Sequence, residues 1–183
     1  MTRTTRVRPL RGTLLMLAGL ALLGARPAAA HEGAHQHGVM HLDIAIQGRA
    51  LTLQLEAPLD SLLGFERRPR NDAERQAVRS MLQTLRQGQA LWQPDPAAGC
   101  RLLDVQLESP LLQPPQAAEP HEHLDLDADF SFQCERPDRL GALQQQLFEH
   151  FPRLQRLLVQ LAGPNGQHRL ELQRPDPRIV LRP

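Results

Sequence analysis

The chain has 183 residues, of which 41% are hydrophobic and 3% aromatic, and a formal charge of +1 at neutral pH. Residues 1–30 contain five arginines and no acidic residue, so residues 31–183 carry 16 arginines against 20 acidic residues, a formal charge of −4. This balance argues against a nucleic-acid-binding protein, and a chain of this length suits one compact domain or two small ones.

Residues 1–30 have the three parts of a secretory signal peptide. Four arginines precede an apolar stretch at residues 14–23, and Ala28, Ala29 and Ala30 follow it. The stretch is too short to span a bilayer comfortably, and small residues at these positions are typical of a cleavage site. We expect cleavage before His31, export to the periplasm, and a mature chain without a membrane span. An uncleaved anchor is the alternative.

Four histidines open the expected mature chain: His31, His35, His37 and His41. Imidazole is the commonest side-chain ligand of zinc and copper in proteins. Residues 31–38 show no hydrophobic periodicity, so we predict a flexible His-rich tail.

Residues 39–99 predict a first β-β-α-β half. Apolar and polar residues alternate over 42–46 and 51–55, and Gly48-Arg49 suits the two-residue turn of a hairpin. Asn71 or Asp72 is placed to cap a helix that Gly88 ends, and a short strand follows at 91–92. The expected inward face of this helix consists of Ala77, Val78, Met81, Leu82 and Leu85.

Residues 100–174 predict a second half. Strands are expected over 103–107 and 124–134, on either side of a Pro-rich loop at 110–120, and a hairpin with strands at 157–161 and 170–172. Asp138 is expected to cap a helix between them. Its inward residues would be Leu140, Leu143, Leu147 and Phe148. Residues 175–183 form a Pro-rich tail.

The two cysteines, Cys100 and Cys134, flank the first two strands of this half. In an exported protein a lone pair usually forms a disulfide, and neither residue has a close His or Cys neighbour to share a metal with. If they face each other in an antiparallel ladder, Phe130 and Phe132 share a face with Asp104. A β-bulge, or a cysteine just outside the ladder, would restore the pattern.

Short similarities between the halves suggest a duplication. Residues 42–46 resemble 103–107, and 54–60 resemble 133–138. We therefore predict an α+β fold of two similar β-β-α-β halves with antiparallel sheets in a pseudo-twofold arrangement. Chance similarity between two amphipathic hairpins is the alternative.

A second histidine cluster, His121 and His123, leads into Asp125, Asp127 and Asp129. On a strand, side chains two residues apart point the same way, so His-x-His can hold one metal ion. Zinc accepts imidazole and carboxylate ligands. The candidate metal ligands are His31, His35, His37, His41, His121, His123 and Asp125. Asp127 and Asp129 fit a solvated strand face better, and a merely polar, His-rich tail is the alternative for the histidines.

No hydrolase, zincin or nucleotide-binding motif occurs in the sequence, so we expect a binding protein and not an enzyme. A free His31 would offer an α-amine and an imidazole, as in copper-brace oxidative enzymes. A glycine-containing tail and the absence of tyrosine make that interpretation the weaker one.

The chain resembles the ZrgA-like family of periplasmic zinc-binding proteins over nearly all of its mature length. The resemblance rests on residues 35–38, 42–45, Gly48, 51–55, 124–134 and 148–152, and most specifically on 58–66, Pro-Leu-Asp-Ser-Leu-Leu-Gly-Phe-Glu. It implies a secreted protein associated with zinc import. Two departures are Arg67, where the family run usually has histidine, and a His/Asp/Glu-rich insert reduced to residues 110–123, which implies a lower zinc capacity.

The sequence thus predicts a periplasmic protein that captures or buffers zinc and delivers it to a zinc ABC importer. An envelope assembly module without a metal is the alternative from another class, and an N-terminal-His copper protein is a third.

Overall fold

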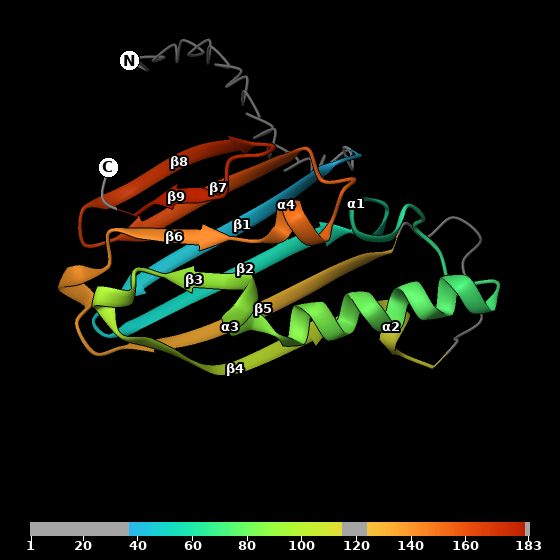
Figure 1. Ribbon diagram of the computed structural model, residues 1–183, viewed down its shortest axis with the longest axis horizontal. Helices are drawn as coiled ribbons and strands as arrows, with labels where there is room; N and C mark the ends of the chain where they lie inside the picture. The colour runs from blue at the N-terminus through green and yellow to red at the C-terminus, as the bar shows by residue number, and fades with distance from the viewer. Residues whose placement is uncertain (1–36, 115–123, 182–183) are drawn as a thin grey trace, which may run out of the picture. The chain divides into compact units, whose positions relative to one another are not determined.

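Two β-sheets with helices beside them make up the part of the chain that the computed structural model describes, residues 37–114 and 124–181 (Figure 1). The large sheet has the strand order β4-β5-β2-β1-β7-β8, and the small sheet has the order β3-β6-β9. The large-sheet strands are β1 (Val39–Gln47), β2 (Ala50–Pro58), β4 (Cys100–Glu108), β5 (Asp125–Cys134), β7 (Arg156–Gly163) and β8 (Gly166–Gln173). The small-sheet strands are β3 (Trp92–Pro94), β6 (Ala142–Gln145) and β9 (Arg178–Val180).

The helices are short except for one. They are α1 (Leu59–Leu63), α2 (Asp72–Arg86), α3 (Gly88–Leu91) and α4 (Leu147–His150), with 3-10 turns η1 (Pro96–Ala98), η2 (Pro110–Leu112) and η3 (Pro137–Arg139). The Asn71 side chain accepts a hydrogen bond from the Glu74 amide at 2.9 Å, so the predicted cap of α2 is confirmed. Met81, Leu82 and Leu85 are buried as expected, whereas Ala77 is exposed. None of the helices in the described ranges combines the length and the hydropathy that a bilayer crossing needs.

Both predicted hairpins are confirmed. β1 and β2 pair up to Gln47 and Ala50 around the Gly48-Arg49 turn. β7 and β8 pair up to Gly163 and Gly166 around a second two-residue turn. The strict alternation of apolar and polar residues sets both registers, because a slip of one residue would turn every buried side chain to solvent.

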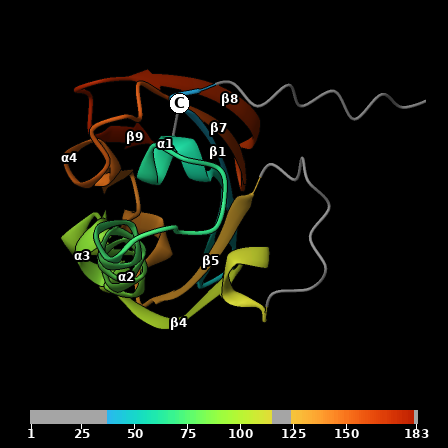
Figure 2. The ribbon, with the colours of Figure 1, turned by 90° about the vertical axis from the view of Figure 1, so that its right-hand side faces the viewer.

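The helices and the small sheet lie on one face of the large sheet (Figure 2). The core between them contains the apolar rows of the central strands, among them Leu42, Ile44, Leu53 and Phe130. The Trp92 ring meets the Phe130 ring edge-on, with centroids 5.6 Å apart. We call the face of the large sheet that the helices and the small sheet cover the inner face. The other face, the outer face, carries the polar residues of each strand.

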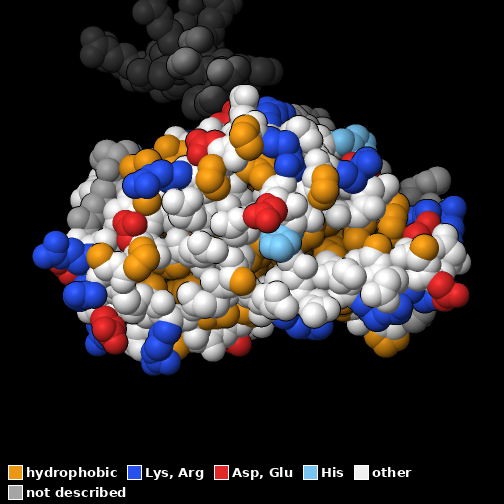
Figure 3. Space-filling view, in the orientation of Figure 1, with side chains coloured by type: hydrophobic (Ala, Val, Ile, Leu, Met, Phe, Trp, Pro, Cys, Tyr) orange, Lys and Arg blue, Asp and Glu red, His pale blue; other side chains and the backbone are white. Residues whose placement is uncertain are grey.

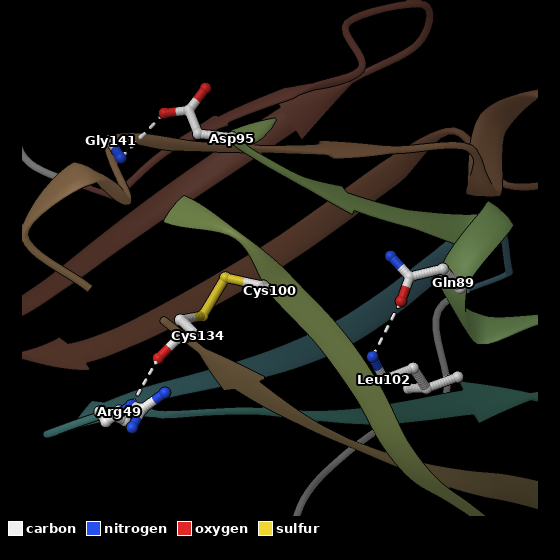
Figure 4. The surroundings of a disulfide bond; sticks show 7 residues. All are labelled: Arg49, Gln89, Asp95, Cys100, Leu102, Cys134 and Gly141. Carbon is white, nitrogen blue, oxygen red and sulfur yellow. Dashed lines mark hydrogen bonds between the residues drawn. A yellow bond between two sulfur atoms is a disulfide. The ribbon is translucent and has the colours of Figure 1, made fainter. Parts of the chain in front are cut away.

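The predicted disulfide joins the edge strand β4 to β5 (Figure 4). Cys100 lies opposite Cys134, and the ladder shifts between Leu102 and Asp104. Of the two alternatives that the sequence left open, the structure therefore has the bulge, which leaves Leu103 51% exposed. Beyond it, Val105 shares the buried side with Phe130, and Asp104 lies opposite Ser131.

The described residues are mostly β-structure with some helices, and the predicted antiparallel-rich sheets are confirmed, but the predicted pair of similar halves is not. Strands from both expected halves share the large sheet, because β1 and β2 lie between β5 and β7. β1 also pairs with β7 in parallel, from Val39↔Arg156 to Ala45↔Ala162.

The helix expected after Asp138 is wrong. Residues 142–145 form β6, the central strand of the small sheet, and α-helix is confined to the four residues of α4. Asp95 Oδ2 accepts a hydrogen bond from Gly141 N at 2.9 Å (Figure 4) and one from Ala142 N at 2.8 Å, and together they fix the start of β6. Pairing on both edges outweighs the helical preference of leucine and glutamine. The supposed Pro-rich tail contributes β9.

Candidate metal-binding end of the large sheet

The strands that follow the two histidine clusters begin at the same end of the large sheet. β1 and β5 are each antiparallel to β2, which lies between them, so they run in the same direction. His41 near the start of β1 lies opposite Glu56, and Glu56 lies opposite Asp127 near the start of β5. The topology therefore brings together two points of the chain that are more than 80 residues apart in sequence.

Helix α1 holds both strands where they begin. The Leu59 amide donates to the Leu124 carbonyl oxygen at 3.1 Å, and the Leu124 amide donates to the Glu66 carbonyl oxygen at 3.3 Å. The next residue, Asp60, accepts a hydrogen bond from His37 Nδ1 at 2.8 Å. Ser61 Oγ accepts from the Gly38 amide at 3.1 Å. Three consecutive residues thus bind the chain just before β1 and just before β5.

The local sequence explains why α1 can do this. Gly64 ends the helix with φ = +86°, a conformation that glycine adopts at little cost, and its amide bonds to the Asp60 carbonyl oxygen at 2.8 Å. A Cβ at this glycine would lie 3.3 Å from Cδ and Nε of Arg153. The glycine therefore leaves room for the guanidinium, which donates from Nε to the Asp60 carbonyl oxygen at 3.0 Å and from Nη2 to Asp60 Oδ1 at 3.1 Å.

Carboxylates gather on the outer face at this end of the sheet. A hollow of about 310 Å³ is lined by His41, Asp43, Gln54, Leu55, Glu56, Glu108, Asp127 and Asp129. Partial desolvation in this hollow raises the pKa of Asp127, and the negative charges of Glu56, Asp125, Asp129 and Glu108 raise it further. On the face seen in Figure 3, by contrast, red and blue side chains are scattered among each other. The concentration of negative charge is therefore a property of the outer face.

The predicted ligands fall into two groups. His31, His35, His121 and His123 lie outside the described residues. His37 is at the start of the described chain, His41 is exposed on the outer face of β1, and Asp125 is half-buried at the start of β5. Within residues 37–114 and 124–181, no group of three His, Cys, Asp or Glu side chains is arranged to hold a metal ion. The expected solvated face is confirmed for Asp127, which is exposed, and only in part for Asp129, which is half-buried.

Sequence reasoning did not identify Asp60 and Arg153 as site residues. They are 93 residues apart, and nothing in the spacing of either residue indicates the other. The only signal was the run 58–66, which the family resemblance singled out without assigning it a structural role.

Arg67 has a structural partner at the position where the family resemblance leads us to expect histidine. Its Nη1 and Nη2 donate to the two carboxylate oxygens of Glu74 at 2.7 and 2.9 Å, and its guanidinium lies over the Phe65 ring, 5.0 Å from the centroid. An arginine is cationic at all relevant pH values and does not ligate zinc. This position therefore contributes to the fold around the start of α2.

No curated protein matches the chain. The sequence model of the ZrgA family, described as zinc uptake proteins, matches residues 34–181. It covers β1, β5, α1 and every other described element. A match over most of the chain shows that this protein belongs to the ZrgA family of zinc uptake proteins.

Proposed function

We propose that the chain is an exported zinc-binding protein that captures zinc in the periplasm and delivers it to a zinc ABC importer. Membership of a zinc uptake family supports a zinc-related role. One observation carries the proposal: the first residues of the two described segments, His37 and Leu124, both bind α1. His37 bonds to Asp60, and the Leu124 carbonyl oxygen accepts from the Leu59 amide.

This arrangement suits capture of one ion by both histidine clusters. His35 precedes His37 by two residues, and His123 is joined to Leu124 by one peptide bond. Neutral imidazoles together with carboxylates form a usual ligand set for Zn²⁺. The acidic outer face adds a negative potential that raises the local concentration of divalent cations.

The signal-like segment supports export. A mature chain that begins at His31 has the first imidazole at its terminus and the second four residues later. The intact mass of protein recovered from the periplasm checks the cleavage position, and retention of residues 1–30 would contradict it.

Zinc titration of the mature chain tests the function. We expect competition with a chromogenic chelator to reveal zinc binding, and His121→Ala combined with His123→Ala to weaken it at least about tenfold, which corresponds to about 1.4 kcal/mol. Removal of residues 31–36, which keeps His37 and Gly38, is expected to lower stoichiometry or slow capture. The matched control is His168→Ala, because His168 lies on β8 opposite Leu161, whereas the start of β1 pairs with Arg156 at the other end of β7.

The pH dependence of binding identifies the ligand class. An imidazole must be neutral to ligate, so affinity carried by histidine falls as pH drops through about 6.5, whereas affinity carried by carboxylates falls mainly near pH 4. A wild-type protein that binds no zinc in competition with the chelator would overturn the proposal and favour an envelope assembly module.

A further inference from the structure

We infer that Asp60 is a positioning residue for a zinc ligand: it holds His37 in the tautomer that presents the Nε2 lone pair for metal binding. This inference rests on the proposed function and assigns it an anchor in the fold. The inference comes from three features around α1: the contact between the Asp60 carboxylate and the His37 imidazole, the pairing of Arg153 with that carboxylate, and the hydrogen-bonded backbone of Gly38, which follows the histidine.

The carboxylate–imidazole contact determines which ring nitrogen is protonated. Asp60 Oδ2 lies 2.8 Å from His37 Nδ1. An ionised carboxylate can only accept hydrogen bonds, so Nδ1 must carry the proton. In the neutral ring the lone pair is then on Nε2. The His37 side chain is 74% exposed and the Asp60 side chain only 10% exposed, which leaves the far side of the ring open to solvent.

Arg153 fixes the carboxylate in turn. Its Nη2 donates to Asp60 Oδ1 at 3.1 Å, so each carboxylate oxygen has its own partner. Its Nε donates to the Asp60 carbonyl oxygen at 3.0 Å, which ties the guanidinium to the backbone of the same residue. The carboxylate therefore cannot rotate away from the imidazole without breaking its pair with Arg153.

The backbone after His37 is held as well. Gly38 has φ = +75°, and a Cβ there would lie 3.0 Å from the Arg153 carbonyl oxygen. Its amide donates to Ser61 Oγ, and its carbonyl oxygen accepts from the amides of Gln155 and Arg156 at 2.8 and 3.0 Å. The backbone next to His37 and the carboxylate that bonds to its ring are therefore both held in position by hydrogen bonds.

Such a pre-oriented histidine has a physical advantage as a ligand. Less conformational entropy is lost when its ring binds a metal, because the ring and its backbone are already ordered. Metal-binding histidines usually donate their second N–H to a carboxylate, and loss of that partner typically costs about 10–100-fold in metal affinity. In the described part of the chain, His37 combines this partner with an open Nε2.

A double-mutant cycle on the mature protein tests the inference, with zinc alone as the probe and a chromogenic chelator as competitor. We expect Asp60→Asn to weaken zinc binding by about 10–100-fold and His37→Ala to weaken it at least as much. The double variant should bind as His37→Ala does, within about twofold, because Asp60 acts only through His37.

Three further measurements separate positioning from a loss of folding. Arg153→Gln retains both the Asp60 and the His37 side chain and removes only the guanidinium that holds the carboxylate. It should therefore weaken zinc binding by a smaller factor than Asp60→Asn. Asp95→Asn is the matched control, since Asp95 is also a carboxylate that holds backbone amides but lies at β3 and β6. It should lower the melting temperature and leave zinc affinity unchanged. Nitrogen-15 NMR of the zinc-free wild type should find the His37 proton on Nδ1.

The outcomes distinguish this inference from the proposed function. Suppose that the wild type binds zinc. The positioning role would then be overturned, and the proposed function would stand, if Asp60→Asn kept the wild-type affinity, if the losses in the double variant were additive, or if Nδ1 of His37 were unprotonated. A wild-type protein that binds no zinc would overturn the proposed function and this inference with it.

Discussion

A single carboxylate, Glu74, collects three strong hydrogen bonds near the start of α2. Two come from Arg67 and the third from the Arg70 amide at 2.6 Å. The Arg67 hydrogen bonds, followed by that of the Arg70 amide, lower the pKa of Glu74 to about 2. The residue that departs from the family pattern is thus part of a local staple between the connector after α1 and the long helix.

The acid sensitivity of this staple can be measured with Glu74→Gln. A folded-state pKa below the unfolded value means that the ionised pair stabilises the fold above about pH 4.5, and that this contribution is lost as pH falls from 4.5 to about 2. We expect the wild type to exceed the variant in free energy of unfolding by a constant amount above pH 5, and the difference to close toward pH 2. Urea unfolding across this range checks it, and a pH-independent difference would contradict it.

The elements differ in how far the sequence predicts them. Alternation predicted both hairpins. The clash between alternation and the Cys100–Cys134 pairing left either a bulge or a cysteine outside the ladder, and only the structure shows the bulge and its place at Leu103. The segment 142–145 was misassigned because its strand partners, β3 and β9, lie about 50 residues before it and 35 after it. Local pattern carries no information on partners at such distances.

β9 gives a direct test of the misjudged C-terminal segment. Ile179 is fully buried, whereas its neighbour Val180 is 43% exposed. Truncation of a buried isoleucine to alanine removes core contacts and leaves a cavity, so Ile179→Ala should lower the free energy of unfolding by about 2–5 kcal/mol. Val180→Ala should change it by no more than about 0.5 kcal/mol. Denaturant unfolding of both variants decides, and equal small effects would show that β9 is dispensable.

On the scale of the whole described unit, charge is distributed unequally between its faces. The acidic residues of β1, β2, β4 and β5 meet on the outer face, and the pKa of Asp127 is raised there. The sequence predicted that Asp125, Asp127 and Asp129 share a face. It could not predict that Glu56 and Glu108 join them, because this depends on the order β4-β5-β2-β1.

Asp127→Asn tests the cost of this concentration. A raised folded-state pKa means that ionisation of Asp127 opposes folding, so the stabilising effect of its proton is full below about pH 3.8 and is lost as pH rises through the folded-state pKa. We expect the variant to be more stable than the wild type at pH 7 with a chelator present, and equal to it near pH 3. At 1 M salt the Debye length is about 3 Å, so repulsion from the neighbouring charges is screened. The stability difference between the variant and the wild type at pH 7 should then become smaller. A variant less stable than the wild type at pH 7 would contradict this account.

The position of β1 has a consequence for the order in which the chain acquires its structure. β1 is among the first described residues, yet it occupies the interior of the large sheet, with β2 on one edge and β7 on the other. Its second partner ends at Gly163, more than 110 residues later. A chain emerging from a ribosome therefore keeps one edge of its first hairpin open until β7 has appeared. Such long-range pairing slows folding and leaves time for the edge to be occupied by a chaperone or by another chain.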